Sequence, residues 1–148
     1  MSQPVPLDTD EAVAELLNRA LKLESFFPEF TAEHARKLFP RSGLYAYDRD
    51  GVLVRQGEPG HDLFIVFSGR VGVYRVEGNK TVSVATLEPG AVIGEIALLR
   101  EVPRTATVTA IEASRVYRLS YLDMRYILDH NEELSAHLKA LAAKRLGL

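Results

Sequence analysis

The spacing of apolar residues divides the chain into three parts. Up to about residue 42, apolar positions recur every three or four residues, which is the period of a helix. From about residue 44 to 119 they alternate with polar positions or form short runs between turns, which is typical of strands. From residue 120 onward the helical period returns. The sequence therefore predicts helices on both sides of a β-rich middle.

Two helices are predicted in the N-terminal part. Asp8 and Glu11 have the spacing of a capping box, so we expect the first helix to begin near Asp8. Its apolar face would consist of Val13, Leu16, Leu17, Ala20 and Leu21. Pro28 cannot continue a helix, and Thr31 can cap a second, short helix that ends at Phe39.

The middle part predicts an antiparallel sandwich or barrel. Its strand-like segments are 63–67, 71–76, 81–85, 105–111 and 115–119. Turn residues separate them at 58–60, 68–69, 77–79 and 88–90. A strand about every ten residues, with such turns between, is typical of these folds.

The C-terminal part again predicts two helices. Ser120 and Asp123 have capping-box spacing, and a second start lies at Asn131. Leu134, Leu138, Leu141 and Ala142 then form an apolar stripe, which Gly147 closes. The apolar face of this amphipathic helix must pack against another part of the molecule.

Composition narrows the class of protein. With 148 residues, 47% of them apolar and 26% charged, we expect one folded domain over residues 1–148. The absence of cysteine excludes disulfides, thiolate metal sites and a cysteine nucleophile. No signal peptide or membrane-spanning stretch is apparent, so we expect a cytoplasmic protein without a membrane partner.

Charge and the remaining reactive residues indicate binding and not catalysis. The net charge is −2 and no cluster of lysine and arginine suggests a nucleic-acid partner. The four histidines are dispersed, so no metal site is expected. No serine lies in a nucleophile-elbow pattern and no paired carboxylates stand out. We therefore expect no enzymatic activity.

The segment 92–108 interrupts the strand pattern and carries the candidate chemistry. Gly94 permits a tight or positive-φ backbone, and residues 95–99 can form one helical turn. The free N–H groups of such a turn, near Ile96 and Ala97, favour an anion. Arg104 follows Pro103 and can bind the same anion with paired hydrogen bonds.

Glu95 makes the expected ligand more specific. A carboxylate accepts hydrogen bonds at neutral pH and repels a phosphate, so it should face a hydroxyl group. A phosphate beside a hydroxyl suggests a sugar phosphate or a nucleotide.

These residues resemble the cyclic nucleotide-binding domain family. Its phosphate-binding cassette has the form Phe-Gly-Glu-Leu-Ala-Leu, a spacer, and Pro-Arg-Ala-Ala. Here residues 93–98 are Ile-Gly-Glu-Ile-Ala-Leu and residues 103–106 are Pro-Arg-Thr-Ala, with no insertion between them. Segments 56–60 and 63–69 also resemble the early strands of the family. The resemblance covers nearly the whole chain.

The resemblance implies a fold and a set of contacts. The fold is an antiparallel, jelly-roll-like β-roll of about eight strands with N-terminal helices (1–42), the roll itself (44–119) and C-terminal lid helices (120–148). Glu95 would bind the ribose 2′-hydroxyl and Arg104 the cyclic phosphate. Gly94, Ile96, Ala97 and Thr105 would complete the cassette. No cofactor is implied besides the ligand, cAMP or cGMP.

The resemblance also implies how the base is covered. Val82 and Val84, two apart on one strand, are candidates for the wall against the base. Residues 137–145 are candidates for a lid that closes over it, so that the nucleotide shifts the population toward the closed form. A protein partner or a fused effector would then respond.

Two positions depart from the family pattern. Ile93 stands in place of the commoner phenylalanine, which is a small change in packing. Thr105 stands where many cAMP-specific kinases have alanine, and in some relatives a hydroxyl there helps to hold cGMP. Other relatives with such a hydroxyl respond to cAMP, so Thr105 leaves the selectivity open. We favour cAMP over cGMP as the ligand.

Other interpretations of the same residues remain. Arg104 can be a surface residue that pairs with Glu95 or Glu101, and Glu95 can simply cap a turn. Thr105 can be an ordinary strand residue, and the stripe from Leu134 can be core packing alone. The whole chain can be a β-roll interaction domain that binds no nucleotide, or an enzyme built on a similar barrel.

Overall fold

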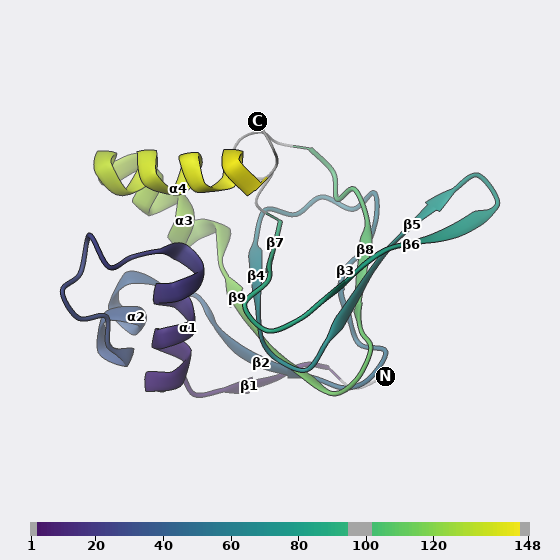
Figure 1. Ribbon diagram of the computed structural model, residues 1–148, viewed down its shortest axis with the longest axis horizontal. Coiled ribbons are helices and arrows are strands. Elements are labelled where there is room, and N and C mark those ends of the chain that lie inside the picture. Colours follow the sequence, from purple (N-terminus) through teal and green to yellow (C-terminus); the bar gives the residue numbers. More distant parts are fainter. Residues whose placement is uncertain (1–2, 95–101, 146–148) are drawn as a thin grey trace.

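Two antiparallel sheets face each other, and the helices gather on one side of them, in the computed structural model of residues 3–94 and 102–145 (Figure 1). The five-stranded sheet has the order β1-β2-β9-β4-β7, and the four-stranded sheet has the order β3-β8-β5-β6. The strands are β1 (Val5–Leu7), β2 (Gly43–Tyr47), β3 (Val52–Val54), β4 (Leu63–Ser68), β5 (Val71–Glu77), β6 (Lys80–Leu87), β7 (Val92–Ile93), β8 (Thr107–Ala110) and β9 (Ser114–Leu119). The predicted antiparallel β-roll is confirmed.

Four helices flank the roll in the part of the chain that the structure describes. They are α1 (Glu11–Leu21), α2 (Ala32–Leu38), α3 (Tyr121–His130) and α4 (Glu132–Arg145). Strand β1 precedes them and pairs with β2, so the N-terminal part is not purely helical as predicted. Within residues 3–94 and 102–145, no helix has the length and apolar character needed to cross a membrane.

The first helix begins later than the capping-box spacing predicts. Asp10, not Asp8, is the N-cap, and its carboxylate accepts a hydrogen bond from the Val13 N–H at 3.0 Å. The Glu11 carboxylate instead accepts from the Ala32 N–H, at 3.1 and 3.2 Å from its two oxygens. Glu11 therefore stabilises the start of α2 rather than that of its own helix, which is a contact that local spacing cannot indicate.

The predicted capping box at the start of α3 is also half wrong. Ser120 is the N-cap and accepts from the Leu122 N–H at 3.2 Å. Asp123 does not return to the Ser120 N–H, which donates to the Ser42 hydroxyl at 2.8 Å. The buried Asp123 carboxylate accepts from the Arg41 N–H and the Ser42 hydroxyl, at 2.9 and 2.6 Å. This carboxylate therefore joins α3 to the loop that precedes β2.

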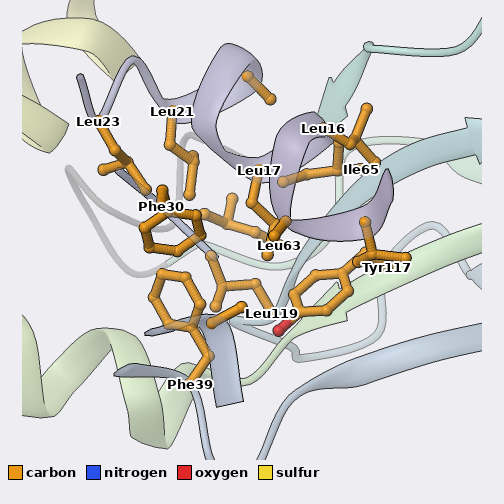
Figure 2. Packing of buried hydrophobic residues seen from close by; sticks show 14 of the residues in the cluster. Leu16, Leu17, Leu21, Leu23, Phe30, Phe39, Leu63, Ile65, Tyr117 and Leu119 are labelled. Carbon is orange, nitrogen blue, oxygen red and sulfur yellow. The ribbon is translucent and has the colours of Figure 1, made fainter. Parts of the chain in front are cut away.

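Strand β4 is buried on both faces, which explains its continuous apolar sequence. Leu63 and Ile65 point toward the helices, whereas Phe64 and Val66 belong to the core between the two sheets. All four are at most 5% exposed. Figure 2 shows the helix-side core, in which side chains from α1, β4 and β9 pack together: Leu16, Leu17, Leu21, Leu63, Ile65, Tyr117 and Leu119.

Tyr117 in this core gives the stability of the fold a dependence on alkaline pH. Burial raises the pKa of its phenol and the Asp123 charge adds to the effect, while a hydrogen bond with Ser42 opposes it. In the unfolded chain the phenol has a pKa of about 10. A group whose pKa is raised by folding contributes stability below the unfolded pKa, and this contribution is lost as the pH rises above it.

We therefore predict a smaller alkaline loss of stability in Tyr117→Phe. Between about pH 10 and about pH 11, the native free energy of unfolding should fall by about 1 kcal/mol more than that of the variant. Urea unfolding curves recorded across this range measure the difference. The same pH dependence in both proteins would contradict the prediction.

Candidate functional site

A cavity of about 240 Å³ opens between the two sheets and the segment that leads into β8. Most of its lining is apolar: Val54, Val73, Leu87, Val92, Ile93, Val102, Pro103, Ala106 and Val108. Gly60, Gly94, Thr105 and Arg104 complete the described lining. Among the described residues, Arg104 is the only charged one that lines this cavity. An apolar hollow with few polar groups is the usual form of a small-molecule site.

The backbone of Arg104 is fixed against the loop between β3 and β4. The Gly57 N–H donates to the Arg104 carbonyl at 2.8 Å, and the Arg104 N–H donates to the Glu58 carbonyl at 2.9 Å. The two bonds of Arg104 go to neighbouring residues and Gly57 has a φ of 84°, which is the pattern of a G1 bulge in an antiparallel ladder. It places residue 104 at the cavity independently of where its side chain points.

The guanidinium of Arg104 lies in a narrow slot. Its Nη2 donates to the Asp62 carbonyl at 2.9 Å, and its central carbon lies 5.9 Å from the centre of the Phe64 ring. A Cβ atom at Gly60 would lie 2.9 Å from Nε, and one at Gly94 would lie 2.8 Å from Nη1. The two glycines are therefore required for the guanidinium to occupy this position.

The electrostatics of the slot favour an added anion. Burial lowers the pKa of Arg104, and the nearby Asp62 charge opposes this, while arginine stays protonated in proteins. The Asp62 carboxylate is paired elsewhere, with Arg118 Nε at 2.7 Å. Within residues 3–94 and 102–145, no carboxylate forms an ion pair with Arg104. A partly desolvated cation with donors to spare is a strong site for a phosphate or carboxylate.

The predicted cassette is only partly within the described structure. Gly94, Arg104 and Thr105 all line the cavity. Gly94 has a positive φ of 96°, as a tight backbone there requires. Glu95, Ile96 and Ala97 lie outside the described residues, so the predicted helical turn and its contacts remain predictions. The alternative partner Glu101 also lies outside them.

The candidate base wall on β6 lies away from the cavity. Val82 pairs with Arg75, which is two residues from the cavity-lining Val73 on β5, so Val82 lies on the cavity face farther out along the hairpin. Val84 has no paired partner, because the register shifts at a bulge opposite Val73 and Tyr74. Val82 and Val84 are 37% and 47% exposed and do not line the cavity.

The candidate lid is packed against other helices. Leu134, Leu138 and Ala142 of α4 are buried, and His137 Nε2 lies 3.0 Å from the Leu21 carbonyl at the end of α1. No described residue of α4 lines the cavity. Three of the four residues of the predicted stripe are thus core packing, whereas Leu141 is only partly buried. A lid role for residues 137–145 remains a prediction.

Three residues of the slot were missed by the sequence reasoning as site residues. The sequence predicts turns at Gly60 and at His61-Asp62, and a strand at Phe64. Neither turn signal reveals the approach of Arg104. In the described part of the chain, no group of three or more histidines or carboxylates could hold a metal ion.

Comparisons with known proteins agree with the geometry. Residues 45–131 match the sequence profile described as "Cyclic nucleotide-binding domain". The chain is 51% identical over 61 residues to acetyltransferase Pat of Mycolicibacterium smegmatis, which covers 41% of this chain and 18% of that protein. It is 31% identical over 112 residues to the cyclic AMP receptor protein of Thermus thermophilus, which covers 75% of this chain and 48% of the relative.

A solved structure shares the fold over nearly the whole chain. The cyclic nucleotide-binding domain from Methylobacillus flagellatus superposes with a TM-score of 0.77 at 24% identity and covers 97% of this chain and 80% of its own. The chain spans less than half the length of the two relatives above. Because the profile match extends over more than half of its residues, the chain belongs to the cyclic nucleotide-binding domain family.

Proposed function

We propose that this chain binds a cyclic nucleotide, cAMP in preference to cGMP, and acts as a regulatory sensor. The observation that carries the proposal is the guanidinium of Arg104, which lies in the glycine slot at the cavity without an ion-pair partner among the described residues. A cyclic phosphate diester bears a single negative charge. One such cation can therefore neutralise it through paired hydrogen bonds.

The order of residues along the chain supports the placement of the sugar. Gly94 is next to Glu95 in the sequence, and a Cβ on Gly94 would touch both Arg104 Nη1 and the Asp62 carbonyl. Because Glu95 follows Gly94 directly in the sequence, we assign its carboxylate to the sugar beside the phosphate-binding cation. Its carboxylate would accept a hydrogen bond from the ribose 2′-hydroxyl, while the N–H groups of Ile96 and Ala97 would donate to the phosphate.

The rest of the cavity suits a base. Val54, Val73 and Leu87 present apolar surface, which stabilises a flat heterocycle by removing it from water. Thr105, the residue after Arg104, lines the same cavity. Preference for cAMP is supported by the Thermus thermophilus relative, whose name describes a cyclic AMP receptor. The Thr105 hydroxyl could donate a hydrogen bond to or accept one from guanine. We therefore expect cGMP to bind as well, although more weakly than cAMP.

Regulation would follow from the position of α4. In the described structure α4 leaves the cavity uncovered and packs its apolar side against the helix-side core. A nucleotide that contacts residues 137–145 only after they close over the base would shift the population toward the closed arrangement. A fused effector or a separate protein would respond to that shift. That the chain itself is not an enzyme remains a prediction, since one relative that it partly matches is an acetyltransferase.

Thermal unfolding tests this proposal. A ligand that binds only the folded chain, present at about 100 times its dissociation constant, adds about 2.7 kcal/mol of stability. We predict that cAMP raises the melting temperature of nucleotide-free protein and that cGMP raises it less at the same concentration.

Linear 5′-AMP is the matched control ligand, because it has the same base and sugar but a doubly charged phosphate that does not close onto the 3′-oxygen. It should raise the melting temperature far less than cAMP. Equal shifts for cAMP and 5′-AMP would indicate a general anion site. No shift with either cyclic nucleotide would favour the interaction domain that binds no nucleotide.

A further inference from the structure

The hairpin of β5 and β6 extends beyond the sheet that carries it (Figure 1). Strand β5 pairs with β8 only as far as Tyr74, which lies opposite Thr107. Its pairing with β6 continues to Glu77 and Lys80. Residues 75–82 therefore form a two-stranded arm, and an isolated two-stranded ribbon is marginally stable in water.

The side chain of Gln56 supplies the missing neighbour of this arm. Its Oε1 accepts a hydrogen bond from the Val76 N–H at 2.8 Å, and its Nε2 donates to the Val76 carbonyl at 3.2 Å. An amide that both accepts from and donates to one residue reproduces the rung that a further residue of a strand would form. Gln56 thus continues the ladder at the point where β8 stops.

The backbone around Gln56 connects this rung to the phosphate-binding cation. The Gln56 N–H donates to the Thr107 hydroxyl at 3.0 Å. The next two residues, Gly57 and Glu58, form the two hydrogen bonds that hold the backbone of Arg104. Three consecutive residues, 56–58, therefore link the arm to the backbone of Arg104.

The arm continues, beyond the cavity lining, the face on which a base would lie. Val73 at its root lines the cavity, and Val82 lies on the same face farther out. A nucleotide whose phosphate is bound by Arg104 can place its base on this face only if the distance between the face and Arg104 matches the length of the nucleotide. Movement of the arm would change the contacts of the base and leave those of the phosphate in place.

We propose that Gln56 is a positioning residue, which holds the arm at the distance from Arg104 that the base of the nucleotide requires. The proposal rests on the proposed function, because it assigns the role of a residue in that same site. It predicts that loss of the Gln56 side chain weakens the binding of the base specifically. A residue that only stabilised the fold would weaken base and phosphate contacts alike.

The test compares two ligands on the native chain and on Gln56→Ala. The ligands are cAMP and the base-free ribose 3′,5′-cyclic phosphate, with affinities measured by calorimetry. In the variant, cAMP should bind about fivefold to tenfold more weakly, since two hydrogen bonds that order the arm are lost, while the base-free ligand should bind as before. The Val76 amide should exchange its hydrogen at least about tenfold faster.

Two further variants complete the comparison. Thr81→Ala removes the exposed cross-strand partner of Val76 without touching Gln56, and it should bind both ligands like the native chain. Gln56→Glu keeps an acceptor for the Val76 N–H but loses the donor, so its affinity for cAMP should lie between those of the native chain and Gln56→Ala. This variant also keeps the test valid if Gln56→Ala folds poorly.

The outcomes separate this inference from the proposed function. Equal weakening of both ligands in Gln56→Ala, or native affinity for cAMP despite faster exchange at Val76, would overturn the role of Gln56 while leaving nucleotide binding intact. A native chain that binds neither ligand would overturn the proposed function and the role of Gln56 with it.

Discussion

Arg104→Ala is expected to weaken cAMP binding at least about thirtyfold. The guanidinium is partly desolvated and donates to the Asp62 carbonyl, and no described carboxylate pairs with it. Removing one partner of a buried, charged hydrogen-bonded pair costs about 2 to 5 kcal/mol, and about 1.4 kcal/mol corresponds to a tenfold change in affinity. The dissociation constant measured by titration calorimetry checks the prediction.

Two further arginine variants test whether cAMP affinity depends on the guanidinium shape and position of Arg104 and not only on a positive charge. Arg104→Lys keeps the charge but loses the planar fork, so it should bind cAMP with an affinity between those of the native chain and Arg104→Ala. Arg115→Ala removes an exposed arginine that lies over the Phe67 ring and bonds Ser68, outside the cavity lining. It should bind like the native chain. Similar affinities for Arg104→Ala and Arg115→Ala would contradict the assignment of Arg104 to the phosphate.

Gly94→Ala is expected to damage both the site and the fold around it. The φ of 96° at Gly94 is strained for any residue with a Cβ atom, which costs about 1 to 3 kcal/mol. The added Cβ would also lie 2.9 Å from the Asp62 carbonyl oxygen and 2.8 Å from Arg104 Nη1. A backbone atom cannot yield easily, so we expect the guanidinium to be displaced and cAMP to bind at least about tenfold more weakly.

The chain offers a matched control for the two parts of this effect. Gly90 has a nearly identical φ of 95°, but a Cβ there would meet nothing within 4 Å. Gly90→Ala should therefore lower the melting temperature through backbone strain and leave the affinity for cAMP unchanged. If Gly94→Ala and Gly90→Ala lost the same stability and both retained cAMP affinity, close packing at Gly94 would not matter to the site.

The parts of the site that lie close together in the sequence could be predicted. The turn chemistry at Gly94 and the spacing to Arg104 are local, and both residues do line the cavity. The alternating pattern also predicted β5 and β6, but it could not show the bulge that leaves Val84 without a partner. A bulge changes which face a residue takes by adding a single residue, and no residue type in this strand marks it.

The parts that depend on contacts between distant segments could not be predicted. Gln56 and Val76, or Gly60 and Arg104, meet only after the two sheets have formed. The same is true of Glu11, whose capping-box spacing suggested a role in its own helix although its carboxylate bonds the start of α2. Strand β1 was not predicted because it is short and contains Pro6. Proline argues against a strand, although it is tolerated at the edge of a sheet.

The central claim is that this chain binds a cyclic nucleotide through Arg104, and calorimetric titration of the native chain, stripped of any bound nucleotide, tests it most directly. We predict saturable binding of one cAMP per chain, with weaker binding of cGMP. No binding heat and no displacement of a labelled cyclic nucleotide, even at millimolar cAMP, would contradict the claim and leave a β-roll that keeps the cassette without its ligand.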